Sequence, residues 1–103
     1  MSLFHGKIRL IHRIVEVAQP EKIIIFGSAA RGESSRNSDV DVLVIKSGAN
    51  RLDLTGKIYL NLHGVGAAVD VVVVTPEDVD RYGDNSALII YPALKEGRVV
   101  YAA

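Results

Sequence analysis

The chain has 103 residues, of which 49% are hydrophobic and 23% charged, a composition typical of one globular domain rather than a disordered segment. Twelve Lys and Arg balance twelve Asp and Glu, which argues against the basic surface of an autonomous nucleic-acid-binding protein. Without cysteine there is no disulfide or thiol nucleophile, and no apolar run approaches the ~20 residues that span a bilayer. We therefore expect a single domain over residues 1–103, in a reducing cytoplasmic compartment, that binds neither membrane nor nucleic acid directly.

The charges are unevenly distributed along the chain. Residues 1–36 carry six Lys or Arg and three acids, whereas acids dominate from Asp39 onward. This pattern is compatible with two solvated faces of opposite sign, or with a basic lip beside an acidic pocket. Charge alone does not decide between them.

The first half of the chain predicts a helix and two strands. Apolar residues recur at helical spacing over 4–18, and Pro20 ends that helix. Residues 23–26 form a β-branched apolar run, typical of a buried strand, that ends at Gly27. Residues 28–37 are small and polar and predict a loop with room for one helical turn, and residues 40–45 predict a second strand.

A second helix is predicted over 51–63. Leu52, Tyr59 and Leu62 share one side of that helix, and Gly64 suits its C-terminal cap.

The last third of the chain predicts two strands separated by helices. Residues 69–74 form an apolar strand, and Thr75 before Pro76 is typical of a helix start. A helix over 87–95 must be kinked or restarted by Pro92, and residues 98–101 predict a terminal strand. The expected fold is of the α/β (α+β) class: one small mixed β-sheet with helices packed on it.

Three aspartates occur in the predicted strands. Asp39 and Asp41 are two residues apart, so they share a face of the sheet with backbone positions roughly 6.6 Å apart. Asp70 is the second residue of a strand otherwise suited to a core, where a lone carboxylate is costly unless paired, protonated or bound to metal. Any one of them alone is compatible with a strand end that faces water. Together they favour a hard divalent cation, Mg²⁺ or Mn²⁺, because all the ligands are oxygen.

A second candidate element directly follows the first predicted strand. Gly27 lets the backbone turn and approach a ligand, and Ser28 offers a hydroxyl and an amide. Arg31 adds a positive charge suited to phosphate oxygens. Most Gly-Ser sequences are merely turns, but a phosphate-type loop beside carboxylates indicates phosphoryl or nucleotidyl transfer.

The spacing of these residues resembles the nucleotidyltransferases related to DNA polymerase beta. Their signature is Gly-Ser, about ten residues and Asp-x-Asp, which Gly27-Ser28 and Asp39-Val40-Asp41 reproduce with ten residues between them. Asp70 falls where the family places its third carboxylate. Residues 94–101 are similar to the closing segment of the minimal nucleotidyltransferase (MNT) branch.

The resemblance implies a polymerase-beta-like nucleotidyltransferase fold and roles for particular residues. Asp39 and Asp41 would bind two Mg²⁺ ions, and Asp70 would bind the ion that activates the attacking hydroxyl. The same resemblance implies that a triphosphate is held by Gly27 and Ser28, assisted by Arg31. Attack of a hydroxyl on the α-phosphate of ATP would then release pyrophosphate.

The MNT branch further implies a partner protein. Its members resemble antitoxins that transfer AMP to a tyrosine of a HEPN-type toxin, with which the chain would form a hetero-oligomer. Two alternatives stay open: an antitoxin that neutralises by binding with little transfer, and a small-molecule nucleotidyltransferase whose acceptor-binding subunit is separate. A chain of 103 residues with a complete catalytic centre leaves little room for an acceptor site, which favours an acceptor on another protein.

Partner-docking surfaces are also predicted. The face of the first helix that carries Arg9 and Arg13 is one candidate, and the apolar run 88–91 is another. His5, His12 and His63 have no metal-like spacing and are expected at the surface.

Overall fold

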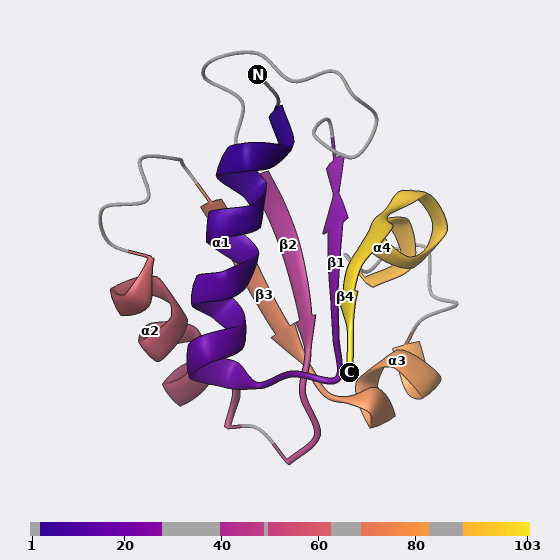
Figure 1. Cartoon of the computed structure of the whole chain (residues 1–103). Coiled ribbons are helices and arrows are strands. Elements are labelled where there is room, and N and C mark those ends of the chain that lie inside the picture. Colours follow the sequence, from indigo (N-terminus) through magenta and orange to yellow (C-terminus); the bar gives the residue numbers. More distant parts are fainter. Residues whose placement is uncertain (1–2, 28–39, 49, 63–68, 83–89) are drawn as a thin grey trace.

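The computed structural model describes residues 3–27, 40–48, 50–62, 69–82 and 90–103 (Figure 1). Within these ranges the chain forms four helices and four strands. In chain order they are α1 (Leu3–Ala18), β1 (Lys22–Phe26), β2 (Val40–Ile45), α2 (Arg51–Asn61), β3 (Val69–Val74), α3 (Pro76–Tyr82), α4 (Ile90–Glu96) and β4 (Arg98–Ala102). No helix in the described ranges has both the length and the apolar character needed to cross a membrane.

The strands form one sheet in the order β3-β2-β1-β4. β2 and β3 pair in parallel, whereas β1 pairs antiparallel with both β2 and β4. The sheet is therefore mixed, which confirms the predicted fold class. β1 and β2 occupy the centre, where both faces need cover, and their residues from Ile23 to Phe26 and from Val42 to Ile45 are all buried.

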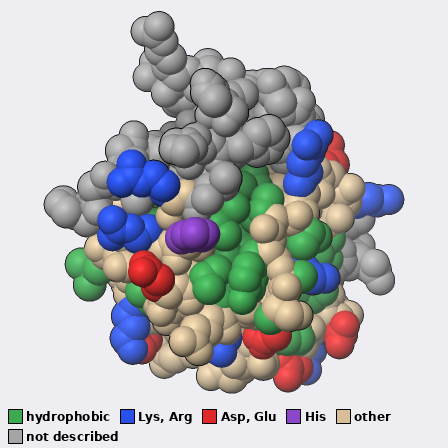
Figure 2. All heavy atoms as spheres, in the orientation of Figure 1, with side chains coloured by type: hydrophobic (Ala, Val, Ile, Leu, Met, Phe, Trp, Pro, Cys, Tyr) green, Lys and Arg blue, Asp and Glu red, His purple; other side chains and the backbone are tan. Residues whose placement is uncertain are grey.

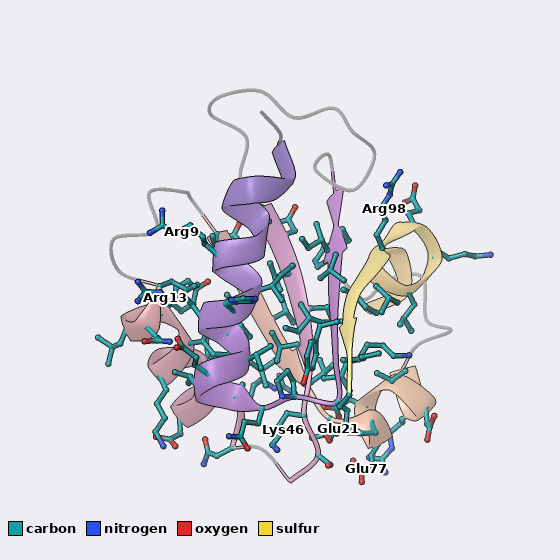
Figure 3. The ribbon with its side chains drawn as sticks, viewed as in Figure 1. Arg9, Arg13, Glu21, Lys46, Glu77 and Arg98 are labelled. Carbon is teal, nitrogen blue, oxygen red and sulfur yellow. The ribbon has the colours of Figure 1, made fainter. Side chains whose placement is uncertain are left out.

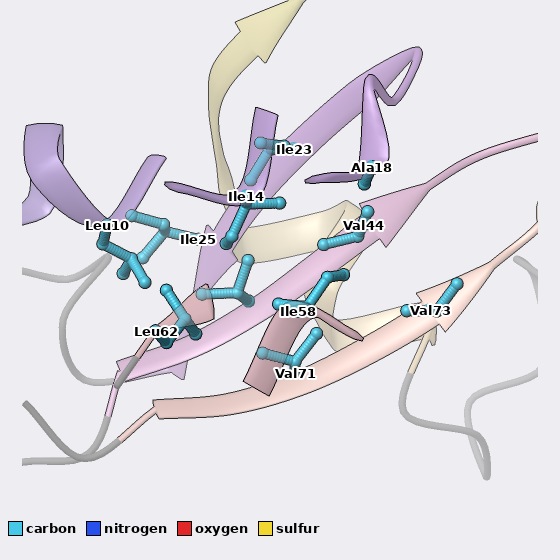
Figure 4. Close-up of a cluster of buried hydrophobic side chains, with 11 residues drawn as sticks. Leu10, Ile14, Ala18, Ile23, Ile25, Val44, Ile58, Leu62, Val71 and Val73 are labelled. Atoms are coloured by element: carbon cyan, nitrogen blue, oxygen red, sulfur yellow. The ribbon is translucent and has the colours of Figure 1, made fainter. Parts of the chain in front are cut away.

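Helices cover both faces of the sheet. α1 and α2 pack on one face, and their buried side chains meet alternate residues of β1, β2 and β3 (Figures 1 and 4). This larger cluster consists of Leu10, Ile14, Ala18, Ile23, Ile25, Val42, Val44, Ile58, Leu62, Val71 and Val73. On the other face, Ala93 of α4 packs on a smaller cluster made of Ile24, Phe26, Leu43, Ile45 and Val74.

The two ends of the sheet differ, and we name them for what they carry. At the turn end β1 begins while β2 and β3 end, and at the carboxylate end β1 ends while β2 and β3 begin. The carboxylate end contains Gly27, Asp41 and Asp70.

The predicted strands are confirmed closely. β2 and β3 have the predicted bounds, and β1 begins one residue earlier, at Lys22. The terminal strand extends to Ala102. The predicted loop over 28–37 lies outside the described residues.

α2 corrects one prediction about which side chains it buries. Ile58 and Leu62 are buried, but Leu52 is 85% exposed although it was grouped with Leu62. The reason is that Ile58, Leu62 and the partly buried Leu54 pack on the core shared with α1 and β3, and Leu52 does not. The helix ends at Asn61, and the predicted cap Gly64 lies outside the described residues.

Pro92 lies in α4, which is described from Ile90. Residues 87–89 lie outside the described residues, so both outcomes for Pro92, a kink or a fresh start, stay predictions.

Of the two arginines on the predicted α1 docking face, one is exposed and the other makes a contact within the fold. Arg9 is exposed, but Arg13 Nη1 donates to the carbonyl of Asn61 at 3.3 Å, and Asn61 Nδ2 donates to the carbonyl of Arg13 at 2.8 Å. Arg13 therefore joins α1 to α2. His12 is exposed as predicted, and the apolar run 88–91 falls largely on undescribed residues.

Candidate functional site

Three strands bring two of the predicted carboxylates together with the predicted glycine. Phe26, the last residue of β1, is the antiparallel partner of Asp41, and Gly27 follows it. Asp41 is the parallel partner of Asp70 on β3. Neighbouring strands lie about 4.8 Å apart, so the two aspartates are adjacent across the ladder. Residues separated by 29 positions in the sequence thus become direct neighbours.

Asp41 and Asp70 also share one face of the sheet. Residues two apart along a strand point the same way, so Asp41 lies on the side of Leu43, and Asp70 lies on the side of Val72. Leu43 and Val72 both belong to the cluster against α4. The two carboxylates therefore point to the face opposite α1 and α2.

Gly27 is packed against the carboxylate of Asp41. Its backbone has φ +79°, in the left-handed region that favours glycine. A Cβ on Gly27 would also lie inside contact distance of Asp41 Oδ2, and 3.4 Å from its Cγ. Any other residue here would strain the backbone and displace the Asp41 side chain.

The solvent exposure of the two aspartates corrects the premise that Asp70 lies in a core strand. Among the described strands β3 lies at an edge of the sheet, and Asp70 is exposed near its beginning, while Asp41 is half-buried. The burial cost expected for a lone carboxylate therefore does not apply to Asp70. Asp70 is a candidate site residue because it pairs with Asp41 across the parallel ladder.

The donor chemistry of this pair fits a hard divalent cation. Two adjacent like charges repel, and carboxylate oxygens are the ligands that Mg²⁺ and Mn²⁺ prefer. Within the described ranges no three His, Cys, Asp or Glu side chains are grouped so as to hold a metal ion. The other predicted site residues, Asp39, Ser28 and Arg31, lie outside those ranges, so their roles stay predictions.

The turn end of the sheet has different electrostatics. Both carboxylate oxygens of Glu21 accept from Ser47 N at 2.9 Å, and Oε2 also accepts from Ser47 Oγ at 2.6 Å. The Ser47 hydroxyl, then its amide, hold the pKa of Glu21 below its ordinary value, and Lys46 adds to the effect. Glu21 and Lys46 lie together at this end in Figure 3.

A capping box closes the same end at the start of α3. Thr75 Oγ1 accepts from Asp78 N at 3.1 Å, and Asp78 Oδ2 accepts from Thr75 N at 3.0 Å. The Thr75 amide is the main reason why the pKa of Asp78 lies below its ordinary value. The sequence prediction that Thr75 begins a helix is confirmed.

A groove of about 360 Å³ lies away from the carboxylates, between α1 and β4. Apolar side chains gather on this face in Figure 2. The groove is lined by Ile11, His12, Val15, Val100 and Tyr101. Its lining residues on α1 place it on the opposite face of the sheet from the carboxylates.

Sequence reasoning missed two features that build the site. The parallel register of β2 and β3 is one, because nothing in either strand alone specifies its partner. The fit of Gly27 against Asp41 is the other, since the prediction concerned the approach of a ligand. The Gly-Ser pattern identified Gly27 as a candidate site residue but did not predict its contact with Asp41.

The fold and the paired carboxylates define a small α+β domain with a candidate metal-binding edge. Residues 9–103 match the profile of the family described as polymerase beta, nucleotidyltransferase. Because that match covers most of the chain, the protein belongs to this nucleotidyltransferase family. No curated protein sequence matches the chain.

Solved structures support the same assignment. The chain has 26% identity and a TM-score of 0.64 with a protein assigned as a minimal nucleotidyltransferase, covering 95% of each chain. It has 26% identity and a TM-score of 0.61 with a protein of Sulfolobus solfataricus assigned as a nucleotidyltransferase, covering 96% of this chain and 86% of that one. A toxin–antitoxin structure with AMP-PNP has the same fold, with 22% identity, a TM-score of 0.60, and coverage of 92% and 73%.

Proposed function

We propose that the chain transfers AMP from ATP to a hydroxyl group of a partner protein and acts as an antitoxin. The observation that carries this proposal is the register of Asp41 with Asp70 beside Gly27, in a chain of the polymerase beta nucleotidyltransferase family. The toxin–antitoxin structures with the same fold support a toxin as the partner. A HEPN-type toxin with a tyrosine acceptor is the specific form of the proposal.

The reaction assigns a task to each residue of the site. The acceptor oxygen bonds to the α-phosphorus, the bond from that phosphorus to the oxygen leading to the β-phosphate breaks, and pyrophosphate leaves. Asp70 is exposed, so in the proposed reaction it would be accessible to the acceptor hydroxyl and would take its proton. Asp41 would hold a metal ion that positions the α-phosphate, and Gly27 packs against the Asp41 carboxylate.

Asp39, Asp41 and Asp70 would hold two Mg²⁺ ions, for which Mn²⁺ could substitute. Bound divalent ions neutralise the charge that develops on phosphate oxygens. Ser28 and Arg31 would hold the triphosphate of ATP.

The test is transfer of α-labelled ATP to the product of the adjacent open reading frame, with Mg²⁺ present. Wild type is expected to label the partner, and Asp41→Ala is expected to abolish labelling. Asp80→Ala is the matched control, because Asp80 is an exposed carboxylate on α3 and should leave labelling unchanged. Equal labelling by wild type and Asp41→Ala would overturn the proposed mechanism.

The same assay separates the alternatives. Neutralisation of the toxin that survives Asp39→Ala with Asp41→Ala would establish an antitoxin that works by binding. Pyrophosphate release with aminoglycosides or other small alcohols, but not with the protein partner, would establish a small-molecule nucleotidyltransferase.

A further inference from the structure

The outer side of α2 carries large apolar side chains that the fold leaves in solvent. Among the described residues, Leu52 at 85% and Leu60 at 79% are the most exposed large hydrophobic side chains. They are eight residues apart, so they lie on one stripe of the helix with Gly56 midway between them. Tyr59 lies beside the stripe and is 43% exposed. We call Leu52, Gly56 and Leu60 the α2 stripe.

Gly56 has no role that the isolated domain explains. A Cβ at this position would meet nothing within 4 Å, so packing does not exclude a larger residue. Glycine is a poor helix former, yet it stands in the middle of an eleven-residue helix. A glycine on an exposed helix face does allow another backbone to approach closely.

The charges beside the stripe are self-complementary. Lys57 Nζ and Asp53 Oδ2 are 3.2 Å apart on one flank, and both side chains are more than three-fifths exposed. When two copies of a helix pack antiparallel about a two-fold axis, the same flank of each copy meets in reversed order. Asp53 of one copy then lies beside Lys57 of the other, and the reciprocal pair forms at the same time.

We propose that the α2 stripe binds a second copy of this chain, with the two α2 helices antiparallel and the two Gly56 residues nearest the two-fold axis. Leu52 of each copy packs on Leu60 of the other. One helix per copy gives a contact below the ~1,200 Å² of a standard interface, so the dimer is weak and depends on concentration. Because α2 and Asp41 lie on opposite faces of the sheet, this proposal stands independently of the proposed function.

Cysteine cross-linking tests the position of the two-fold axis. The chain has no cysteine, so a single introduced thiol reports one position. Gly56→Cys is expected to form a disulfide-linked dimer under mild oxidation about tenfold faster than Glu77→Cys, an exposed control on α3, because only position 56 meets its own copy within disulfide reach. Equal rates for the two variants would overturn the proposed geometry.

Sedimentation analysis of the full chain tests the surface itself. The average mass of wild type is expected to rise with concentration from the monomer's 11.1 kDa toward twice that value. Leu52→Gln with Leu60→Gln should stay monomeric, and circular dichroism checks that these exposed changes leave the fold intact. Asp53→Lys should weaken the dimer, and adding Lys57→Asp should restore it. A wild-type monomer at all concentrations, or a dimer that survives the double glutamine change, would overturn the proposal.

Discussion

The two ends of the sheet use acidic side chains in opposite ways. At the turn end, Glu21 accepts hydrogen bonds from the amide and the hydroxyl of Ser47, Asp78 accepts one from the amide of Thr75, and both carboxyl groups have lowered pKa values. At the carboxylate end, Asp41 and Asp70 are adjacent across a parallel ladder, and Gly27 is packed against Asp41. Acids at the turn end therefore stabilise the fold, whereas the pair at the carboxylate end places like charges side by side, as a cation site requires.

The largest expected effect follows from changing Asp41 to Asn. The substitution keeps the side-chain shape and removes one charge, so we expect transfer to fall roughly 10²–10³-fold, the size typical of losing one preorganised electrostatic group. Activity and thermal unfolding are measured on the same samples. Asp80→Asn is the control, and a matching activity loss in that variant would show that the carboxylate end has no special role.

The next largest effect is expected at Gly27. Gly27→Val strains a positive φ and forces the Asp41 side chain to move, so we expect a loss of about 2–4 kcal/mol in the free energy of unfolding. Gly56→Ala is the matched glycine change, because space is open there and helix propensity improves by up to about 1 kcal/mol.

Denaturant unfolding at low protein concentration measures both glycine variants. Equal tolerance of the two substitutions would contradict the close packing of Gly27 on Asp41.

A smaller effect is expected at the α3 capping box. Thr75→Ala leaves the Asp78 amide without its side-chain acceptor, so we expect a loss of about 1 kcal/mol in the free energy of unfolding. Transfer activity per folded molecule should be unchanged, because Thr75 lies at the turn end. Loss of activity without loss of stability would contradict the assignment of a structural role to the turn end and a functional role to the carboxylate end.

The smallest effect is a pH dependence of stability at the turn end. Because folding lowers the pKa of Glu21, its contribution is complete above the ordinary glutamate value of 4.5 and is lost as pH falls through the lower folded pKa. Thermal unfolding should therefore show a shallower acid slope in Glu21→Gln than in wild type. Parallel acid slopes for the two proteins would mean that the hydrogen bonds from Ser47 do not stabilise the charged form.

Local sequence patterns predicted the positions of helices and strands well, but they did not predict strand order or pairing register. The strands at 40–45 and 69–74 were recognisable because their apolar runs are bounded by polar residues, and Thr75 was recognisable as a helix cap. Strand order and the parallel register are long-range properties that neither strand encodes alone. For that reason the local pattern predicted neither the edge position of β3, on which Asp70 is exposed, nor the exposure of Leu52 on α2.

For the same reason, the sequence predicted residues of the candidate site but not how those residues contact one another. The spacing of Gly27 and Asp41 fits a family signature, and the family assignment is confirmed. The pairing of Asp41 with Asp70 and the contact of Gly27 with Asp41 arise only when three strands come together.

Calorimetric titration of Mg²⁺ and ATP into matched variants tests the difference between the two ends most directly. Wild type and Glu21→Gln are expected to bind the nucleotide equally well, because Glu21 lies at the turn end. Asp41→Asn is expected to bind it at least about tenfold more weakly, since a ligand charge is lost. Equal affinity in all three proteins would contradict the assignment of the carboxylate end as the nucleotide and metal site.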